Sequence, residues 1–295
     1  MAYAEPQPRS TGLLGRAPSA GLVVGAIASV QLGAALATTL FSRLGPAGAV
    51  LVRVVAASVV LAAIWRPQIR GRPRRELVLA GVLGFVLAAM NLCFYESIAR
   101  IPLGTAVTIE FVGPLAVAVA GSRRALDFAW VALAVIGILA LTRGATHSLD
   151  GLGVALALIA GGFWGAYIVL NGRVGRAFER GTGIALSMCV ASVLLLPVGI
   201  AAAGAHLLVA KSLAIGAGVG ILSSAIPYSF EHEALRRIAA SVFGVLMSLE
   251  PAVAALAGFV LLGQGVSARE IVGIGFVVAA SAGASRRIGA APVDA

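Results

Sequence analysis

Glutamates inside apolar segments are the side chains of this 295-residue sequence best placed to do chemistry. Glu110 and Glu250 lie deep in such segments, and each is followed by a proline, Pro114 and Pro251. Proline cannot donate to the carbonyl four residues earlier, so Pro114 frees the carbonyl of Glu110, and Gly113 permits further distortion. A carboxylate beside a free backbone acceptor could hold a substrate amine or a proton. The alternative for Glu250 is a carboxyl kept neutral because burial disfavours its charged form.

Arg53 is a basic residue inside an apolar segment. It could form a structural ion pair with Glu110, or it could bind a substrate carboxylate through its planar fork of donors. Snorkelling toward the interface and a packing role are further interpretations. A zwitterionic amino acid needs both an anion and a cation to replace its hydration, and Glu110 with Arg53 could supply them.

Uncharged polar side chains occur at other apolar positions. Asn91 and Tyr95 are four residues apart and therefore share one face of a helix, and Tyr228 follows Pro227 in another apolar segment. Gln31 is a weaker candidate of the same kind. Hydrogen bonding between helices is the alternative to substrate binding for all of them. Pro227, like Gly113, Pro114 and Pro251, is a candidate hinge.

The elements that must position these residues are membrane helices. Hydrophobic residues make up 60% of the chain and charged residues only 12%, which is too few charges to cover a water-soluble fold. A membrane helix needs about 20 apolar residues. Ten such segments are predicted, at 19–41, 46–65, 77–97, 102–121, 126–142, 151–170, 182–203, 211–230, 240–263 and 268–285. Asp150 is expected to cap the helix that follows it. The fold class is therefore all-α and polytopic.

The distribution of basic residues predicts the orientation. Of the 22 Lys and Arg residues, 16 fall in the tails and loops of one side, five fall in those of the other, and Arg53 lies within a segment. Positive charge stays in the cytoplasm, so both termini are expected there, in the inner or plasma membrane. This accounts for the net charge of +10 without nucleic acid. Glu231 is expected on a solvated face at the cytoplasmic boundary.

Other function classes lack their motifs. No P-loop sequence is present, so the chain is not an ATP-driven pump by itself, and no catalytic triad is visible in the apolar segments, which argues against an enzyme. Cys93 and Cys189 are far apart and form no metal-binding motif. We expect neither a metal nor a cofactor. Three GxxxG pairs, among them Gly161 and Gly165, favour close helix packing.

A shift of 137 residues aligns the two halves of the chain. Glu96 then meets Glu233, Arg100 meets Arg237, and Pro114 meets Pro251. Each half holds five predicted segments, and an odd number forces the second half to cross the membrane in the opposite sense. Such an inverted repeat is a recurring plan of secondary transporters. The expected units are a disordered cytoplasmic tail (1–18) and two five-helix repeats (19–142 and 151–287).

Several segments are similar to the bacterial threonine/homoserine exporter family, within the EamA-type drug/metabolite transporters. They are Met90–Tyr95, Ile101–Ala106, Ile109–Leu115 and Ser122–Arg124 in the first half, and Ile226–Ser229, Phe243–Ala252 and Leu262–Gln264 in the second. The resemblance covers about residues 19–287. It implies ten helices in two inverted repeats and export of small amino acids or related metabolites, driven by the proton gradient. Gln264 departs from it, because many relatives carry an acidic residue there.

The resulting hypothesis is a secondary active exporter of threonine- or homoserine-like amino acids that works by proton antiport and alternating access. Glu110 or Glu250 would carry the proton. The alternatives are an exporter of drugs or other metabolites with the same fold and, less favoured, a channel or membrane enzyme. The expected partners are a small-molecule substrate, protons and membrane lipids, and a homodimer is left open.

Overall fold

The computed structural model describes residues 18–120, 125–142, 150–179, 181–235 and 246–288. At some of these positions, Tyr228 among them, only the backbone is described. The predicted tail lies outside the described residues apart from Pro18. The elements are helical throughout, and no strand occurs in the described ranges. The chain is therefore an all-α protein.

Five helices are long and apolar enough to cross a membrane. They are α2 (Ser19–Thr38), α3 (Phe41–Trp65), α4 (Arg74–Ile98), α8 (Gly151–Ala177) and α9 (Thr182–Ala203), the last followed by the short helix η1 (Gly204–Leu208). Helix α8 continues beyond its predicted end at residue 170. Large apolar side chains on the outer surface, such as Val59, Phe85 and Val260, are more than half exposed. Such surfaces suit a lipid environment, and the chain is a multi-pass membrane protein.

The shorter apolar helices are interrupted. Helices α5 (Leu103–Glu110) and α6 (Val112–Val119) meet at Phe111, just before Pro114. Helix α10 (Ala210–Gly220) passes through the π-helix η2 (Ile221–Ala225) into α11 (Ile226–Leu235), whose second residue is Pro227. Because a proline cannot bond to the carbonyl four residues back, the regular hydrogen-bond ladder is disturbed at both places. The remaining helices of the described ranges are α7 (Ala125–Thr142), α13 (Glu250–Leu262) and α14 (Ala268–Ile288).

Local sequence explains several helix ends. The Asp150 carboxylate accepts hydrogen bonds from the backbone N–H groups of Leu152 (2.8 Å) and Gly153 (3.0 Å), which confirms the predicted cap. Gly45 has a φ of 65°, outside the helical range, and bends α3 directly before Pro46, where the helix was predicted to start. The entry to α3 is therefore a kink rather than a clean start.

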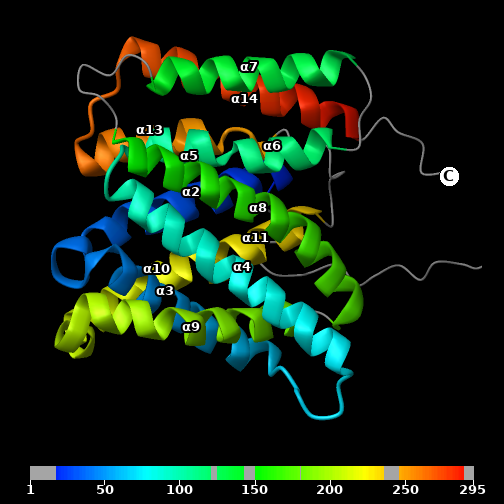
Figure 1. Cartoon of the computed structure of the whole chain (residues 1–295), viewed down its shortest axis with the longest axis vertical. Coiled ribbons are helices and arrows are strands. Elements are labelled where there is room, and N and C mark those ends of the chain that lie inside the picture. The colour runs from blue at the N-terminus through cyan, green and yellow to red at the C-terminus, as the bar shows by residue number, and fades with distance from the viewer. Residues whose placement is uncertain (1–17, 121–124, 143–149, 180, 236–245, 289–295) are drawn as a thin grey trace, which may run out of the picture.

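The helices pack as neighbouring pairs (Figure 1). Helix α3 lies along α9, α4 along α8, α2 along α11, α5 along α13, and α7 along α14. The pair α7/α14 forms one edge of the bundle and the pair α3/α9 the opposite edge, with α5, α13, α2, α8 and α4 between them (Figure 1). The main apolar core joins α3, α4, α5 and α9. The predicted substrate- and proton-binding residues lie on α2, α3, α4, α5 and α13, apart from Tyr228, which belongs to α11.

Candidate functional site

Glu110 ends α5 at the break between α5 and α6, and its side chain is buried. Helix α8 crosses this break with its backbone in contact: a Cβ placed on Gly161 would lie 2.5 Å from the carbonyl oxygen of Glu110. A Cβ on Gly113 would collide with the carbonyl of Gly161 in turn. The Glu110 carbonyl, which the sequence predicted to be a free acceptor, is therefore covered by α8. The carboxyl side chain is the group left to do chemistry.

Glu250, the first residue of α13, lies beside Gln31 of α2. Gln31 Nε2 donates a hydrogen bond of 3.2 Å to Glu250 Oε1, and both side chains are buried. The second carboxyl oxygen of Glu250 and the amide oxygen of Gln31 are also buried, and neither has a hydrogen-bond partner in the described part of the chain. Buried polar atoms are rarely left unpaired. These two oxygens could therefore accept a hydrogen bond from a proton on the carboxyl or from a polar ligand.

Arg53 of α3 lies against Tyr95 of α4, with its guanidinium carbon 5.4 Å from the centre of the Tyr95 ring. This is cation–π geometry. The Tyr95 side chain is fully buried, and its hydroxyl has no hydrogen-bond partner among the described residues. Arg53 and Glu110, both described, form no ion pair. The structural Arg53–Glu110 pair, left open from the sequence, is absent, and the two opposite charges stay separate.

The charged groups still influence one another. The Glu110 carboxyl interacts electrostatically with Glu250 and with Arg53, and Arg53 acts on Tyr95. With the Gln31–Glu250 hydrogen bond, these electrostatic interactions link five side chains from α2, α3, α4, α5 and α13. We call Gln31, Arg53, Tyr95, Glu110 and Glu250 the central polar cluster. It combines two carboxyls, one guanidinium and two uncharged hydrogen-bonding groups.

Two predicted site residues, Asn91 and Tyr228, are not part of this cluster. Asn91 is buried one turn before Tyr95, but its Nδ2 donates to the backbone carbonyl of Leu87 at 2.8 Å, within its own helix. Asn91 thus bonds α4 to itself rather than to a neighbouring helix. The side chain of Tyr228 lies outside the described residues. Of the predicted hinges, Pro251 stands in the first turn of α13, directly beside Glu250.

Sequence reasoning missed two features next to the cluster. Glu231 of α11 is half-buried rather than solvated, and its charge acts on Glu250. The π-helix η2 packs on α2, where Ser29 Oγ donates to the carbonyl of Leu222 at 2.7 Å. Pro227 was the one signal of this irregular turn. No three His, Cys, Asp or Glu side chains converge to hold a metal ion within the described ranges.

Comparison with known proteins adds to this geometry. Residues 151–286 match the EamA-like transporter family. The threonine/homoserine exporter RhtA of Escherichia coli (strain K12) is 40% identical over 264 residues, covering 88% of each chain. This chain belongs to the EamA-like transporter family.

Two further similarities agree with the assignment to the EamA-like family. RhtA of Salmonella typhimurium (strain SL1344) is 40% identical over 267 residues, which cover 89% of this chain and 90% of that protein. A crystal structure with 17% identity matches with a TM-score of 0.60 over 90% of this chain and 98% of its own, and it supports the fold alone. The named relatives are exporters. The chain is a membrane transporter rather than an enzyme, as its sequence predicted.

Proposed function

We propose that this EamA-like transporter is a secondary active exporter of small amino acids of the threonine and homoserine type, coupled to proton entry. The observation that carries the proposal is the buried Glu250 carboxyl, held by Gln31 through one oxygen only and coupled electrostatically to Glu110. The names of the two RhtA relatives support the substrate class. Location in the inner or plasma membrane with both termini in the cytoplasm is part of the proposal, and the charge bias supports it.

The central polar cluster suits a zwitterion. The substrate ammonium would bind at Glu110 and its carboxylate at Arg53, because these opposite charges lie in one interior and are not paired with each other. Charge-assisted hydrogen bonds of this kind are the strong ones. Tyr95 and Gln31 each keep a buried oxygen without a partner in the described residues, and these oxygens would accept from the substrate's remaining polar hydrogens.

Proton coupling would use the two carboxyls. Repulsion between nearby carboxylates is relieved when one of them takes a proton. Binding of the substrate ammonium at Glu110 would displace that proton and so make amino acid and proton compete for one site. Competition between two ligands at a site that opens alternately to the two sides produces antiport.

Alternating access would come from ten helices arranged as two inverted repeats, 19–142 and 151–287. The helix pairing supports this arrangement. If the halves are exchanged, the contact of α4 with α8 becomes that of α11 with α2, and both contacts are present. The pairs α3/α9, α5/α13 and α7/α14 each join equivalent helices of the two halves, so the exchange leaves them unchanged. All three pairs are in contact. Two halves with equivalent contacts can swap conformations and expose one central site to each side in turn.

Counterflow of radiolabelled threonine and homoserine in proteoliposomes, at two imposed pH gradients, tests the proposal. The wild-type protein is expected to exchange both amino acids faster with an inward proton gradient. Glu110→Gln and Glu250→Gln should lose this pH dependence, whereas Glu96→Gln, which changes the same group in a surface ion pair with Arg100, should keep it. Unchanged pH dependence in Glu110→Gln would refute its role. Competition by drugs but not by amino acids, or a flux that does not saturate, would favour the alternative functions.

A further inference from the structure

The start of α5 and the end of α13 lie at the same end of the bundle, where one side chain joins them. Helix α13 ends at Leu262, and the next two residues are Gly263, whose φ of 64° is left-handed, and Gln264. The backbone N–H of Gln264 donates to the carbonyl of Gly258 at 3.1 Å, which fixes the turn. Its side-chain Oε1 accepts a hydrogen bond of 3.1 Å from the backbone N–H of Leu103, the first residue of α5. Gln264 thus closes one helix end and caps the start of another.

The two helices are in backbone contact directly beside this cap. A Cβ placed on Gly104 would lie 2.5 Å from the Cα of Ala255, and one on Gly258 would lie 2.5 Å from Oε1 of Gln264. Nothing larger than hydrogen therefore fits at either glycine without a shift. Helices α5 and α13 belong to different halves of the chain. The hydrogen bond from Leu103 to Gln264 therefore connects the two halves across the interface of α5 and α13, which we call the seam.

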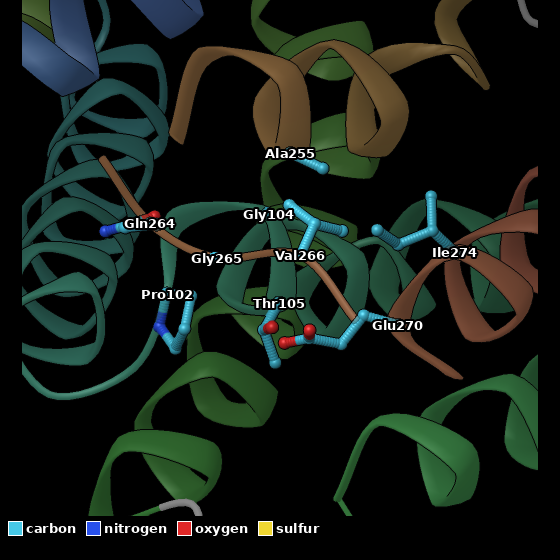
Figure 2. Close-up of a pocket in the computed structure, with 9 residues that line it drawn as sticks. All are labelled: Pro102, Gly104, Thr105, Ala255, Gln264, Gly265, Val266, Glu270 and Ile274. Carbon is cyan, nitrogen blue, oxygen red and sulfur yellow. The ribbon is translucent and has the colours of Figure 1, made fainter. Parts of the chain in front are cut away.

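A small notch with a free volume of about 10 Å³, the space that one water molecule needs, lies at this seam (Figure 2). Pro102, Thr105, Gln264, Val266 and Glu270 are among its lining residues. Thr105 is only 3% exposed, so the notch ends at the wall formed by the packed helices. Glu110 lies five residues further along α5, about 7.5 Å deeper at 1.5 Å per residue. The closed seam therefore separates the notch from the central polar cluster.

We propose that Gln264 is a latch that holds this end of the transporter closed, and that the Leu103–Gln264 hydrogen bond must break when the end opens toward the outside. The inference rests on the proposed function, since alternating access requires the two halves to part at one end at a time. Transport then needs a bond that is strong enough to favour closure and weak enough to be broken in each cycle. A single hydrogen bond from a backbone N–H to a neutral side-chain oxygen has that character. A carboxylate at this position would also accept from the Leu103 N–H.

Thiol labelling tests the latch without transport. A Thr105→Cys reporter is placed in a background in which Cys93 and Cys189 are replaced by alanine, and a membrane-impermeant thiol reagent is added from outside. Gln264→Leu, which removes the acceptor, should raise the labelling rate about three- to tenfold, the effect of losing one hydrogen bond. Gln264→Glu, which keeps an acceptor and makes it charged, should label no faster than the wild type. Gly151→Cys, an exposed position with open space around it that does not line the notch, controls for reagent delivery and should not respond to either change.

The outcomes separate the latch from the proposed function. Faster labelling in Gln264→Leu but not in Gln264→Glu supports the latch, whatever the substrate proves to be. Equal labelling in Gln264→Leu and the wild type overturns it, even if amino acid counterflow is present. An increase of the same size in Gln264→Glu also overturns it, because the acceptor would then not matter.

Discussion

Gly161→Ala adds one methyl group where α8 crosses the break between α5 and α6. The added Cβ would lie 2.5 Å from the carbonyl oxygen of Glu110, whereas an ordinary contact begins at 3.4 Å, so the helices must part by roughly 0.9 Å. Overpacking of this kind costs about 1–3 kcal/mol. The next residue, Gly162, is exposed and has open space around it. Gly162→Ala is therefore a matched control in the same turn of the same helix.

Helix propensity contributes equally to both variants and cancels in their comparison. Alanine stabilises a helix interior by about 1 kcal/mol relative to glycine. We therefore expect Gly162→Ala to gain about 1 kcal/mol and Gly161→Ala to be about 1–3 kcal/mol less stable than Gly162→Ala. For a chain of this size, that difference lowers the melting temperature by roughly 2–6 °C.

Tryptophan fluorescence in detergent measures both the stability and the local displacement. The ring of Trp164 in α8 packs edge-on against Phe111, with centroids 5.3 Å apart. With Trp65 and Trp130 replaced by phenylalanine, the remaining emission reports this contact. It should shift in Gly161→Ala and not in Gly162→Ala, and transport should fall in the first variant only. Equal melting temperatures and unshifted emission in the two variants would refute the inferred backbone contact.

Four further predictions address other parts of the molecule. Gln31→Leu leaves Glu250 without its hydrogen bond and should lower the free energy of unfolding by about 1–3 kcal/mol and remove most of the transport rate. Gln68→Leu, at an exposed site, should change neither quantity. Asp150→Ala should lower stability by about 1 kcal/mol in thermal melts, and Asp150→Asn by less, with transport per folded molecule unchanged. Tyr95→Phe keeps the ring facing Arg53 but removes the hydroxyl proposed to accept from the substrate, so it should lose part of the substrate affinity in binding assays, and Tyr95→Leu, which removes the ring as well, should lose more. Reporters fused to the two ends of the chain should both read out in the cytoplasm, and opposite readings would contradict the proposed topology.

The helices could be predicted from the sequence because apolar segment length and proline position act locally. Nearly every predicted segment contains a helix of the structure, and the breaks in two of them stand beside Pro114 and Pro227. The Asp150 cap was equally readable, since a cap depends on neighbours two and three residues away. The same locality made the predicted end of α8 too early, because the charges of Arg173 and Arg176 did not stop the helix.

The partners of the site residues were not predictable in this way. The sequence gives the depth of a side chain along its helix but not the direction in which the assembled bundle turns it. Arg53 contacts Tyr95 rather than pairing with Glu110, and Gln31, the weakest candidate, is the hydrogen-bond partner of Glu250 across 219 residues of sequence. The half-burial of Glu231 depends likewise on how α11 rotates against α2. These facts are set by the rotation of each helix in the assembled bundle, which the apolar pattern of a segment does not reveal.

The π-helix between α10 and α11 has a consequence for every residue that follows it. A π turn holds more residues than an α turn, so it acts as an insertion within an otherwise continuous helix. A regular α turn at Ile221–Ala225 would not absorb the extra residue and would rotate α11 by about 100° around its axis, the angle of one α-helical residue. Glu231 would then point away from Glu250. The facing of that carboxylate is thus encoded in the number of residues before it, and not only in their chemical types.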